Sequence, residues 1–372
     1  MTFGAAPLGR RAVLPSKVSD PTSAEPPIRL LLVDDSSVAR AVLSRMIAGR
    51  PGLEVAATAS NAGEALALLG AAMFDIVLLD VEMPGESGLD ALPEIIRAGR
   101  GARVVICSSV AEAGAETSVR ALALGAADAM PKPGSGLFGG RFADELAERL
   151  LRIGRVGSVD RDAPSARGPL ALREVHDWRP ACIAIGASTG GIHAIHDFLG
   201  GLPGEMGIPI LVTQHLPPLF MPFFARQLEQ VSGRFARVVE EGMRLEPDVI
   251  HVAPGHAHLG LSTNGGGVRV ALDDTPAPSG CRPSVDPMLA AVAEAYGRGG
   301  LAVMLSGMGR DGLIGSGSLV SAGGIVLAQD QDSSAIWGMP RAVAEAGLAT
   351  AISPPADLAR QVAARLGVAA WR

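Results

Sequence analysis

The segment Cys182-Ile-Ala-Ile-Gly-Ala-Ser188-Thr189-Gly190-Gly191 sets the architecture of the second half of the chain. Its apolar beginning predicts a buried strand and a helical pattern follows the glycines, so Ser188 lies on a tight turn between strand and helix. Glycines on both sides permit the strained backbone of a nucleophile elbow, with free N–H groups at the helix start for a developing oxyanion. Turns of this kind also bind phosphate groups. The segment alone therefore leaves a catalytic serine and an anion-binding turn as open interpretations.

Apolar runs alternate with helical patterns on both sides of this turn. Before it, we expect strands at 28–33, 53–57, 74–79, 102–107 and 127–130, and helices at 37–48, 62–71, 88–98, 115–124 and 141–153. After the linker, we expect strands at 182–186, 208–213, 236–240, 249–253, 301–306 and 324–329, and a hairpin around 257–272. This alternation is typical of doubly wound parallel sheets, so the sequence predicts two α/β domains.

Composition limits the possible partners. The chain has 372 residues, a formal charge of −6 and three well-separated cysteines. The acidic balance offers no basic surface, so we expect no nucleic-acid partner. No apolar run approaches the roughly 20 residues of a membrane span, so we expect a cytoplasmic protein that is not membrane-inserted. Composition also predicts a disordered leader at 1–27, a first domain at 28–153, a linker at 154–179 and a second domain at 180–372.

Polar residues end successive strands of the first domain. Asp34 and Asp35 follow the first strand, Asp80 the third, Ser108 the fourth, and Lys132, one of only two lysines in the chain, the fifth. The carboxyl ends of parallel strands meet at one edge, so these side chains are expected to converge there. Each aspartate alone could cap a helix or open a turn. Three crowded carboxylates repel one another unless a cation holds them, and Mg²⁺ suits a few oxygen ligands.

These positions resemble those of response-regulator receiver domains. The resemblance rests on Val33-Asp34-Asp35-Ser36, Leu79-Asp-Val-Glu-Met-Pro84, Ser108-Ser109 and Lys132-Pro133. It implies a flavodoxin-like receiver fold in which Asp80 takes a phosphoryl group from a histidine kinase. It also implies Mg²⁺ on the carboxylates of Asp34, Asp35 and Asp80, with the Glu82 carbonyl as a further ligand. Ser108 and Lys132 would then contact the phosphoryl group.

A serine nucleophile needs a base and an orienting acid. The strand predicted before His215 delivers this side chain to the same sheet edge as Ser188, and a loop histidine is the alternative. Asp311, in a glycine-rich turn after another buried strand, is the expected orienter of the imidazole. Its competitors, which we interpret as solvated turn residues, are Asp248, Asp273, Asp274 and Asp286. A metal site is the less favoured interpretation of His251, His256 and His258.

The order Ser188, His215, Asp311 separates this domain from the α/β-hydrolases, whose histidine follows the acid. With the motifs Thr213-Gln-His-Leu-Pro-Pro218, Arg282-Pro-Ser-Val-Asp286 and Gly307-Met-Gly-Arg-Asp-Gly312, the second domain resembles the CheB chemotaxis-receptor methylesterases. The resemblance implies a Rossmann-like three-layer α/β/α domain with Ser188 as nucleophile. Thr189 and Met308 would build the oxyanion site. The chain departs from the family pattern at Cys281, where relatives often have histidine, and at Arg310, where asparagine is common.

The combined resemblance implies a phosphorylation-activated serine hydrolase. Its expected substrates are glutamate methyl esters on methyl-accepting chemotaxis receptors, with release of methanol, and deamidation of receptor glutamines is a second expected activity. The esterase reaction would need no cofactor. The unphosphorylated receiver would cover the active site, and a chemotaxis histidine kinase would be the phosphodonor. The alternatives are a receiver-controlled binding module and a hydrolase acting on another methylated signalling protein.

Overall fold

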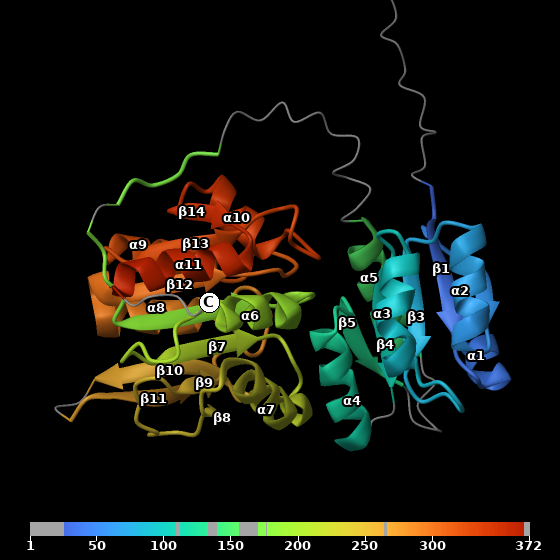
Figure 1. Ribbon diagram of the computed structural model, residues 1–372, viewed down its shortest axis with the longest axis horizontal. Helices are drawn as coiled ribbons and strands as arrows, with labels where there is room; N and C mark the ends of the chain where they lie inside the picture. Colours follow the sequence, from blue (N-terminus) through green and yellow to red (C-terminus); the bar gives the residue numbers. More distant parts are fainter. Residues whose placement is uncertain are drawn as a thin grey trace, which may run out of the picture.

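The computed structural model describes residues 26–108, 112–132, 140–155, 170–175, 177–263 and 266–367, which form two α/β units (Figure 1). Residues 1–25 of the expected disordered leader and most of the expected linker lie outside these residues. The elements of the first unit are β1 (Ile28–Val33), α1 (Ser37–Ile47), β2 (Leu53–Ala59), α2 (Ala62–Ala71), β3 (Ile76–Asp80), α3 (Gly88–Ala98), β4 (Arg103–Ser108), α4 (Glu112–Ala123), β5 (Asp128–Pro131) and α5 (Gly140–Arg155).

The first unit is a five-stranded parallel sheet in the order β2-β1-β3-β4-β5. This is the strand order of flavodoxin-like folds, as the sequence predicts. Its central strand, β3, reads Ile-Val-Leu-Leu-Asp and is buried along its whole length, because helices cover both faces. One face carries α1 and α5 through Leu43, Ile47 and Leu150, and the other carries α2, α3 and α4.

The second unit contains more helices and strands than the first. They are β6 (Cys182–Ala187), α6 (Gly191–Gly200), β7 (Ile210–Gln214), the 3-10 helix η1 (Pro218–Phe220), α7 (Met221–Ser232), β8 (Ala236–Val238), β9 (Ile250–Val252), β10 (His258–Thr263), β11 (Val268–Asp273), α8 (Val285–Tyr296), the 3-10 helix η2 (Gly297–Gly299), β12 (Gly300–Met304), α9 (Leu313–Ser321), β13 (Ile325–Gln329), α10 (Met339–Glu345), β14 (Ala351–Ser353) and α11 (Pro355–Leu366).

Seven of these strands form one parallel sheet in the order β14-β13-β12-β6-β7-β9-β8. Phe198, Phe224 and Leu358 pack α6, α7 and α11 on one face, while Met288 and Leu319 pack α8 and α9 on the other. The expected hairpin is present as the antiparallel pair β10-β11. The prediction of a parallel three-layer α/β/α arrangement is therefore confirmed. None of the described helices combines the length and apolarity that crossing a membrane requires.

Sequence patterning was wrong at several element ends. The strand expected at 236–240 ends at Val238, and the edge strand β14 was missed because its three residues are all half-buried. The segment expected as linker is also partly structured. The Arg173 N–H donates to the Ala349 carbonyl at 2.9 Å, and Trp178 is only 8% exposed, so this end of the segment packs on the second unit.

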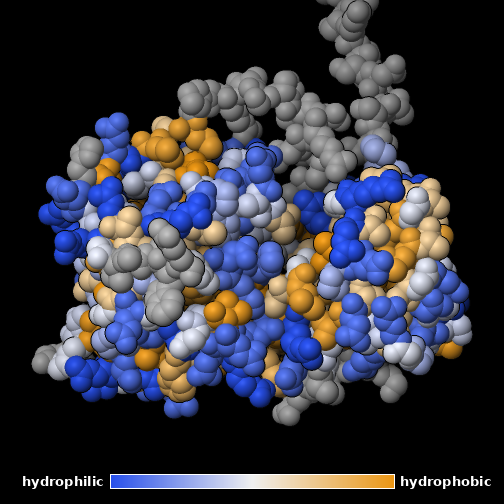
Figure 2. All heavy atoms as spheres, viewed as in Figure 1, coloured by the Kyte–Doolittle hydropathy of each residue, from blue (hydrophilic) through white to orange (hydrophobic). Residues whose placement is uncertain are grey.

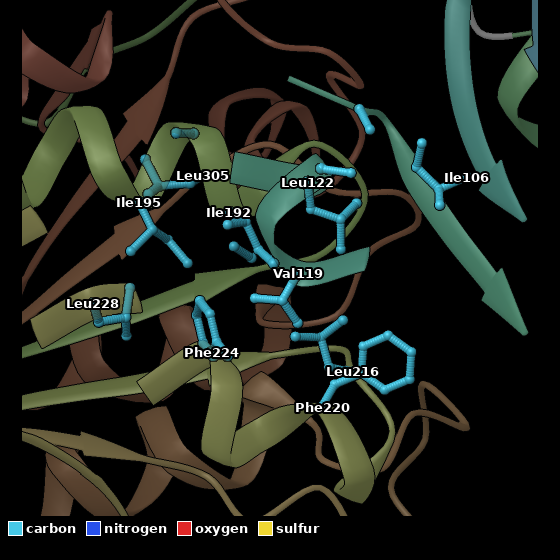
Figure 3. Packing of buried hydrophobic residues seen from close by; sticks show 14 of the residues in the cluster. Ile106, Val119, Leu122, Ile192, Ile195, Leu216, Phe220, Phe224, Leu228 and Leu305 are labelled. Atoms are coloured by element: carbon cyan, nitrogen blue, oxygen red, sulfur yellow. The ribbon is translucent and has the colours of Figure 1, made fainter. Parts of the chain in front are cut away.

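The two units are in contact through α4, which lies beside α6, η1 and α7 (Figure 1). Val119 and Leu122 of α4 belong to the same buried apolar cluster as Ile192, Leu216 and Phe220 of the second unit (Figure 3). Outside this contact, hydrophilic side chains cover most of the visible face, and apolar residues form only small groups (Figure 2). A second apolar contact involves Ile336, which belongs to the core cluster of the first unit that contains Leu150 and Ile153.

The Gly190 N–H adds a polar contact between the units, since it donates to the Ala127 carbonyl of the first unit at 2.8 Å. The Arg103 Nε likewise donates to the Ala335 carbonyl at 3.1 Å. The turn that carries Ser188 is thus bonded directly to the first unit.

Gly307 permits a close approach between the turn after β12 and the turn at Ser188. A Cβ atom on Gly307 would lie 2.4 Å from Met339 Sδ and 3.0 Å from both Ser188 N and Ser188 Cβ. Backbone atoms cannot move aside as a flexible side-chain end does, so a methyl group at this position displaces the Ser188 turn.

We therefore expect Gly307→Ala to lower the free energy of unfolding of the second unit by roughly 1–3 kcal/mol, as overpacking does. Gly317→Ala is a matched control, because Gly317 lies inside α9 with open space around its Cα. Alanine there should stabilise the helix by roughly 0.5–1 kcal/mol. Denaturant unfolding measures both, and equal midpoints for the two variants would show that the close approach is not a constraint.

Candidate active site

Ser188 lies at the carboxyl end of β6 on the turn that leads into α6. Gly190 has φ +73°, in the left-handed region that glycine tolerates. The Ser188 N–H donates to the Ser306 carbonyl at 3.0 Å, and the Ser188 carbonyl accepts from the Gly191 N–H at 2.8 Å. The turn is thus held by its own backbone and by the end of β12, and the Ser188 side chain lines a cavity.

His215 directly follows β7, the strand beside β6. Its N–H donates to the Ala187 carbonyl at 3.2 Å, so the backbone links the two strand ends. Its Nε2 atom lies 2.7 Å from Asp311 Oδ2. Burial alone would lower the pKa of His215, but hydrogen bonds with Asp311 and Cys281 outweigh burial and raise it to about 9. The surroundings thus stabilise the imidazolium, the form that general-base catalysis produces.

Asp311 is fixed by three hydrogen bonds. Besides His215, its carboxylate accepts from Ser284 Oγ at 2.6 Å and from the Val285 N–H at 2.7 Å. Burial would raise the pKa of Asp311, but the contact with His215 and the bonds from Ser284 and Val285 hold it below its usual range. Asp311 is thus an oriented and ionised partner of the imidazole ring.

The interpretation of Asp286 as a solvated turn residue was wrong. Asp286 lies in the first turn of α8, is 7% exposed and accepts from the Gly315 N–H at 2.7 Å. Burial raises its pKa to about 6, and the neighbouring charge of Asp311 adds to the rise. The proline-rich segment before Val285 favours a turn in the sequence, so the start of α8 at Val285 was not predicted.

The other competing residues do not meet the Ser188 turn. Asp248 accepts from the Met206 N–H, and Asp273 from the Thr275 N–H. His258 is held between the Ser284 N–H and the Thr275 carbonyl. Among the described residues, the metal-ligand groups found do not include the histidines at 251, 256 and 258. Asp248, Asp273 and His258 therefore have structural partners of their own.

One cavity of about 640 Å³ unites the expected catalytic side chains. Its lining includes Ser188, Thr189, His215, Met308 and Asp311. Within the described part of the chain, neither the Thr189 N–H nor the Met308 N–H has a hydrogen-bond acceptor, so both are free to bind a ligand oxygen. No hydrogen bond joins the Ser188 hydroxyl to the His215 ring among these same residues. Such bonds are often long without substrate and tighten when it binds.

The first unit contributes to the same cavity. Leu122, Ala127, Asp128, Arg149 and Arg152 line it opposite the Ser188 turn. None of these residues is a predicted site residue, because apolar residues such as Leu122 and basic helix residues such as Arg149 and Arg152 carry no sign of the surface that they will cover. Cys281 was noted only as a departure from a family pattern, yet it also lines the cavity.

The carboxylates of Asp34, Asp35 and Asp80 gather at the edge of the first sheet, with ligand atoms within 4.8 Å of one another. Lys132 Nζ lies 2.6 Å from Asp80 Oδ2 and 2.8 Å from Asp34 Oδ2, although the latter contact lacks hydrogen-bond geometry. Burial raises the pKa of Asp80, against the effect of Lys132. A buried carboxylate oxygen without a hydrogen bond, among three acidic oxygen donors, fits Mg²⁺.

The hydroxyl of Ser108 is not free, because it is hydrogen-bonded to α4. Its Oγ lies 2.5 Å from Ser118 Oγ and 3.3 Å from the Gly114 carbonyl, both in α4. Ser118 was missed from the sequence, since a serine inside a helical pattern gives no signal of a partner on a neighbouring strand. Ser108 thus connects the end of β4 to the helix that contacts the second unit.

Comparison with known proteins agrees with this geometry. The family model for the response regulator receiver domain matches residues 30–136, and the model for the CheB methylesterase matches residues 183–362. The protein-glutamate methylesterase/protein-glutamine glutaminase 1 of Paramagnetospirillum magneticum is 38% identical, over 92% of this chain and 97% of that protein. The protein-glutamate methylesterase/protein-glutamine glutaminase 2 of Caulobacter vibrioides is 39% identical, over 91% and 99%.

Among solved structures, the CheB methylesterase catalytic domain of Thermotoga maritima is 34% identical and covers 49% of this chain and 97% of its own, with a TM-score of 0.48. The two full-length relatives span both units in the same order as this chain. The chain therefore belongs to the family of receiver-linked CheB methylesterases, the protein-glutamate methylesterases/protein-glutamine glutaminases.

Proposed function

We propose that this chain hydrolyses the methyl esters of glutamate side chains on chemotaxis receptors, with Ser188 as the nucleophile. The observation that carries the proposal is the cavity lined by Ser188, by the hydrogen-bonded pair His215 and Asp311, and by Thr189 and Met308. Each group that an acyl transfer needs is then within one site. The esterase reaction uses only these groups and no cofactor.

In the proposed mechanism, His215 takes the proton of the Ser188 hydroxyl as Oγ attacks the ester carbonyl. The Thr189 and Met308 N–H groups donate to the oxyanion, and the imidazolium beside Asp311 returns its proton to the departing methanol. Water then hydrolyses the acyl-enzyme with the same base. A glutamine side chain would follow the same course with ammonia as the leaving group.

The receiver is proposed to regulate this site through Asp80, phosphorylated by a chemotaxis histidine kinase in the cytoplasm. Asp34, Asp35 and Asp80 would hold Mg²⁺, which neutralises charge on the transferring phosphoryl group when bound. Lys132 adds a second positive charge beside Asp80, because burial, which would lower its pKa, is outweighed by the two carboxylates that it faces.

The contact across the two units supports a covering role for the receiver. Leu122 is 5% exposed and lines the cavity opposite Ser188. The bond between Gly190 and Ala127 holds the receiver on the nucleophile turn. In the proposal, a phosphoryl group on Asp80 attracts the Ser108 hydroxyl away from α4, and this weakens the position of α4 on the second unit.

Replacement of Ser188 tests the catalytic assignment. We expect Ser188→Ala to lower methanol release from methylated receptor membranes by at least about a thousandfold, since the covalent step loses its nucleophile. The unfolding midpoint of the variant serves as the control for folding. An active-site serine reagent should label the native chain at Ser188 and leave the variant unlabelled.

If the variant keeps most of its rate, Ser188 is not the nucleophile. If the native chain reacts with the reagent but releases no methanol from receptors, it is a hydrolase of another substrate. Failure of both assays would favour a binding module.

A charge in the α4 contact tests the covering role. Leu122→Asp removes the free energy gained by burying this side chain, roughly 1.5–3 kcal/mol. This loss shifts the equilibrium from the covered toward the open state by about tenfold or more. We therefore expect a higher rate without phosphodonor and a smaller further rise when a small phosphodonor and Mg²⁺ are added.

Leu124→Asp is the matched control, because Leu124 is 47% exposed just beyond the end of α4. It should leave the basal rate close to that of the native chain. Phosphorylation of Asp80 in both variants shows that the receiver is folded. Equal basal rates for the native chain and a folded Leu122→Asp variant would contradict covering by α4.

A further inference from the structure

Three side chains with different donor atoms meet at the cavity. Cys281 Sγ, a ring nitrogen of His215 and a carboxylate oxygen of Asp311 all lie within 4.8 Å of one another. They come from three separate segments, namely the end of β7, the loop before α8 and the turn after β12. The proposed esterase reaction uses the histidine and the aspartate but gives the thiol no task.

This donor set fits a thiophilic divalent cation. Thiolate sulfur, imidazole nitrogen and carboxylate oxygen are the ligands of Zn²⁺, and three protein ligands with an open fourth position are typical of its accessible sites. Ligand atoms around one Zn²⁺ lie about 3–4 Å apart, and Cys281 is a free and partly exposed cysteine, so its side chain can adjust toward the other two ligands. The carboxylate pocket at Asp80 offers oxygen alone, which suits Mg²⁺ instead.

The surroundings already orient two of the three ligands. Ser284 Oγ and the Val285 N–H fix the Asp311 carboxylate, and the backbone N–H of His215 donates to the Ala187 carbonyl, while the 2.7 Å contact between His215 Nε2 and Asp311 Oδ2 would give way to the two bonds to the ion. Outer hydrogen bonds of this kind are what hold ligands in metal sites. The cavity of about 640 Å³ in front of them has room for an ion with its water.

We propose that Cys281, His215 and Asp311 form a Zn²⁺ site that reversibly inhibits the hydrolase. Binding converts the Cys281 thiol to a thiolate and the His215 imidazolium to neutral imidazole, and both protons leave to solvent. Only one nitrogen of a neutral imidazole carries a lone pair that can accept a proton. When that lone pair binds the metal ion, His215 can no longer take the proton of Ser188. The inhibitory part rests on the proposed esterase function, whereas the binding part does not.

Cobalt absorption tests the binding part without any assay of activity. The full chain is titrated with Co²⁺, and the near-ultraviolet band of a thiolate-to-cobalt bond is followed. We expect the band to saturate near one equivalent and to disappear when Zn²⁺ displaces Co²⁺. The oxygen ligands at Asp80 cannot produce this band, so cobalt bound there does not interfere.

Cys281→Ser should abolish the band. Cys182→Ala is the matched control, since Cys182 is fully buried in β6 and is not among the residues that line the cavity. This control should keep the band. No band in the native chain, or a band that persists in Cys281→Ser, overturns the proposed site.

Hydrolysis of a chromogenic ester then tests inhibition, with each variant compared with its own metal-free rate. Cys281→Ser should raise the Zn²⁺ concentration for half-inhibition by at least about tenfold, since even an outer partner of a metal ligand contributes 10–100-fold. Equal inhibition of both chains would mean that the histidine alone binds Zn²⁺, and it would overturn the proposal. A native chain that shows the cobalt band but has no hydrolase activity would refute the proposed function and leave the metal site standing.

Discussion

The hydrogen bond from the Gly190 N–H to the Ala127 carbonyl joins the nucleophile turn directly to the receiver. Gly190 immediately precedes α6 and has φ +73°, in the left-handed region that glycine tolerates. Val119 and Leu122 of α4 belong to the apolar cluster that spans the same two units. In the proposed mechanism, this turn presents Ser188 to a substrate and releases Ala127 before a receptor helix approaches. Access to the serine and the position of α4 would then be one equilibrium.

The size of this contact suits a switch. Moving a two-state equilibrium from 1:99 to 99:1 takes about 5.5 kcal/mol. Burial of two or three apolar side chains at roughly 1.5–3 kcal/mol each supplies a similar amount. Val119 and Leu122 are the large apolar side chains that α4 contributes to this cluster, and the 1–3 charge-assisted hydrogen bonds gained by a phosphoryl group can compete with the burial of two side chains. A much larger apolar interface would hold the two units together irrespective of phosphorylation.

Much of this arrangement was predictable because parallel sheets gather their functional groups at one edge. The strand ends near Asp34 and Asp80, and those near Ser188 and His215, could be located from apolar runs alone. The placement of one unit on the other could not, since Ala127 and Leu122 have no chemistry that the sequence marks. Proximity of Cys281 to His215 was equally hidden, because the two approach only after the loop before α8 has folded.

Lys132 illustrates why a chain whose basic residues are almost all arginine keeps a lysine. Its single Nζ atom lies 2.6 Å from one oxygen of Asp80 and 2.8 Å from one oxygen of Asp34, so one compact charge serves two carboxylates. A guanidinium is planar and matches both oxygens of a single carboxylate. An arginine at this position would bind both oxygens of Asp80, and its guanidinium would also occupy the space that a phosphoryl group requires. The ammonium instead can follow Asp80 from carboxylate to acyl phosphate, because its three donors rotate freely about one short bond.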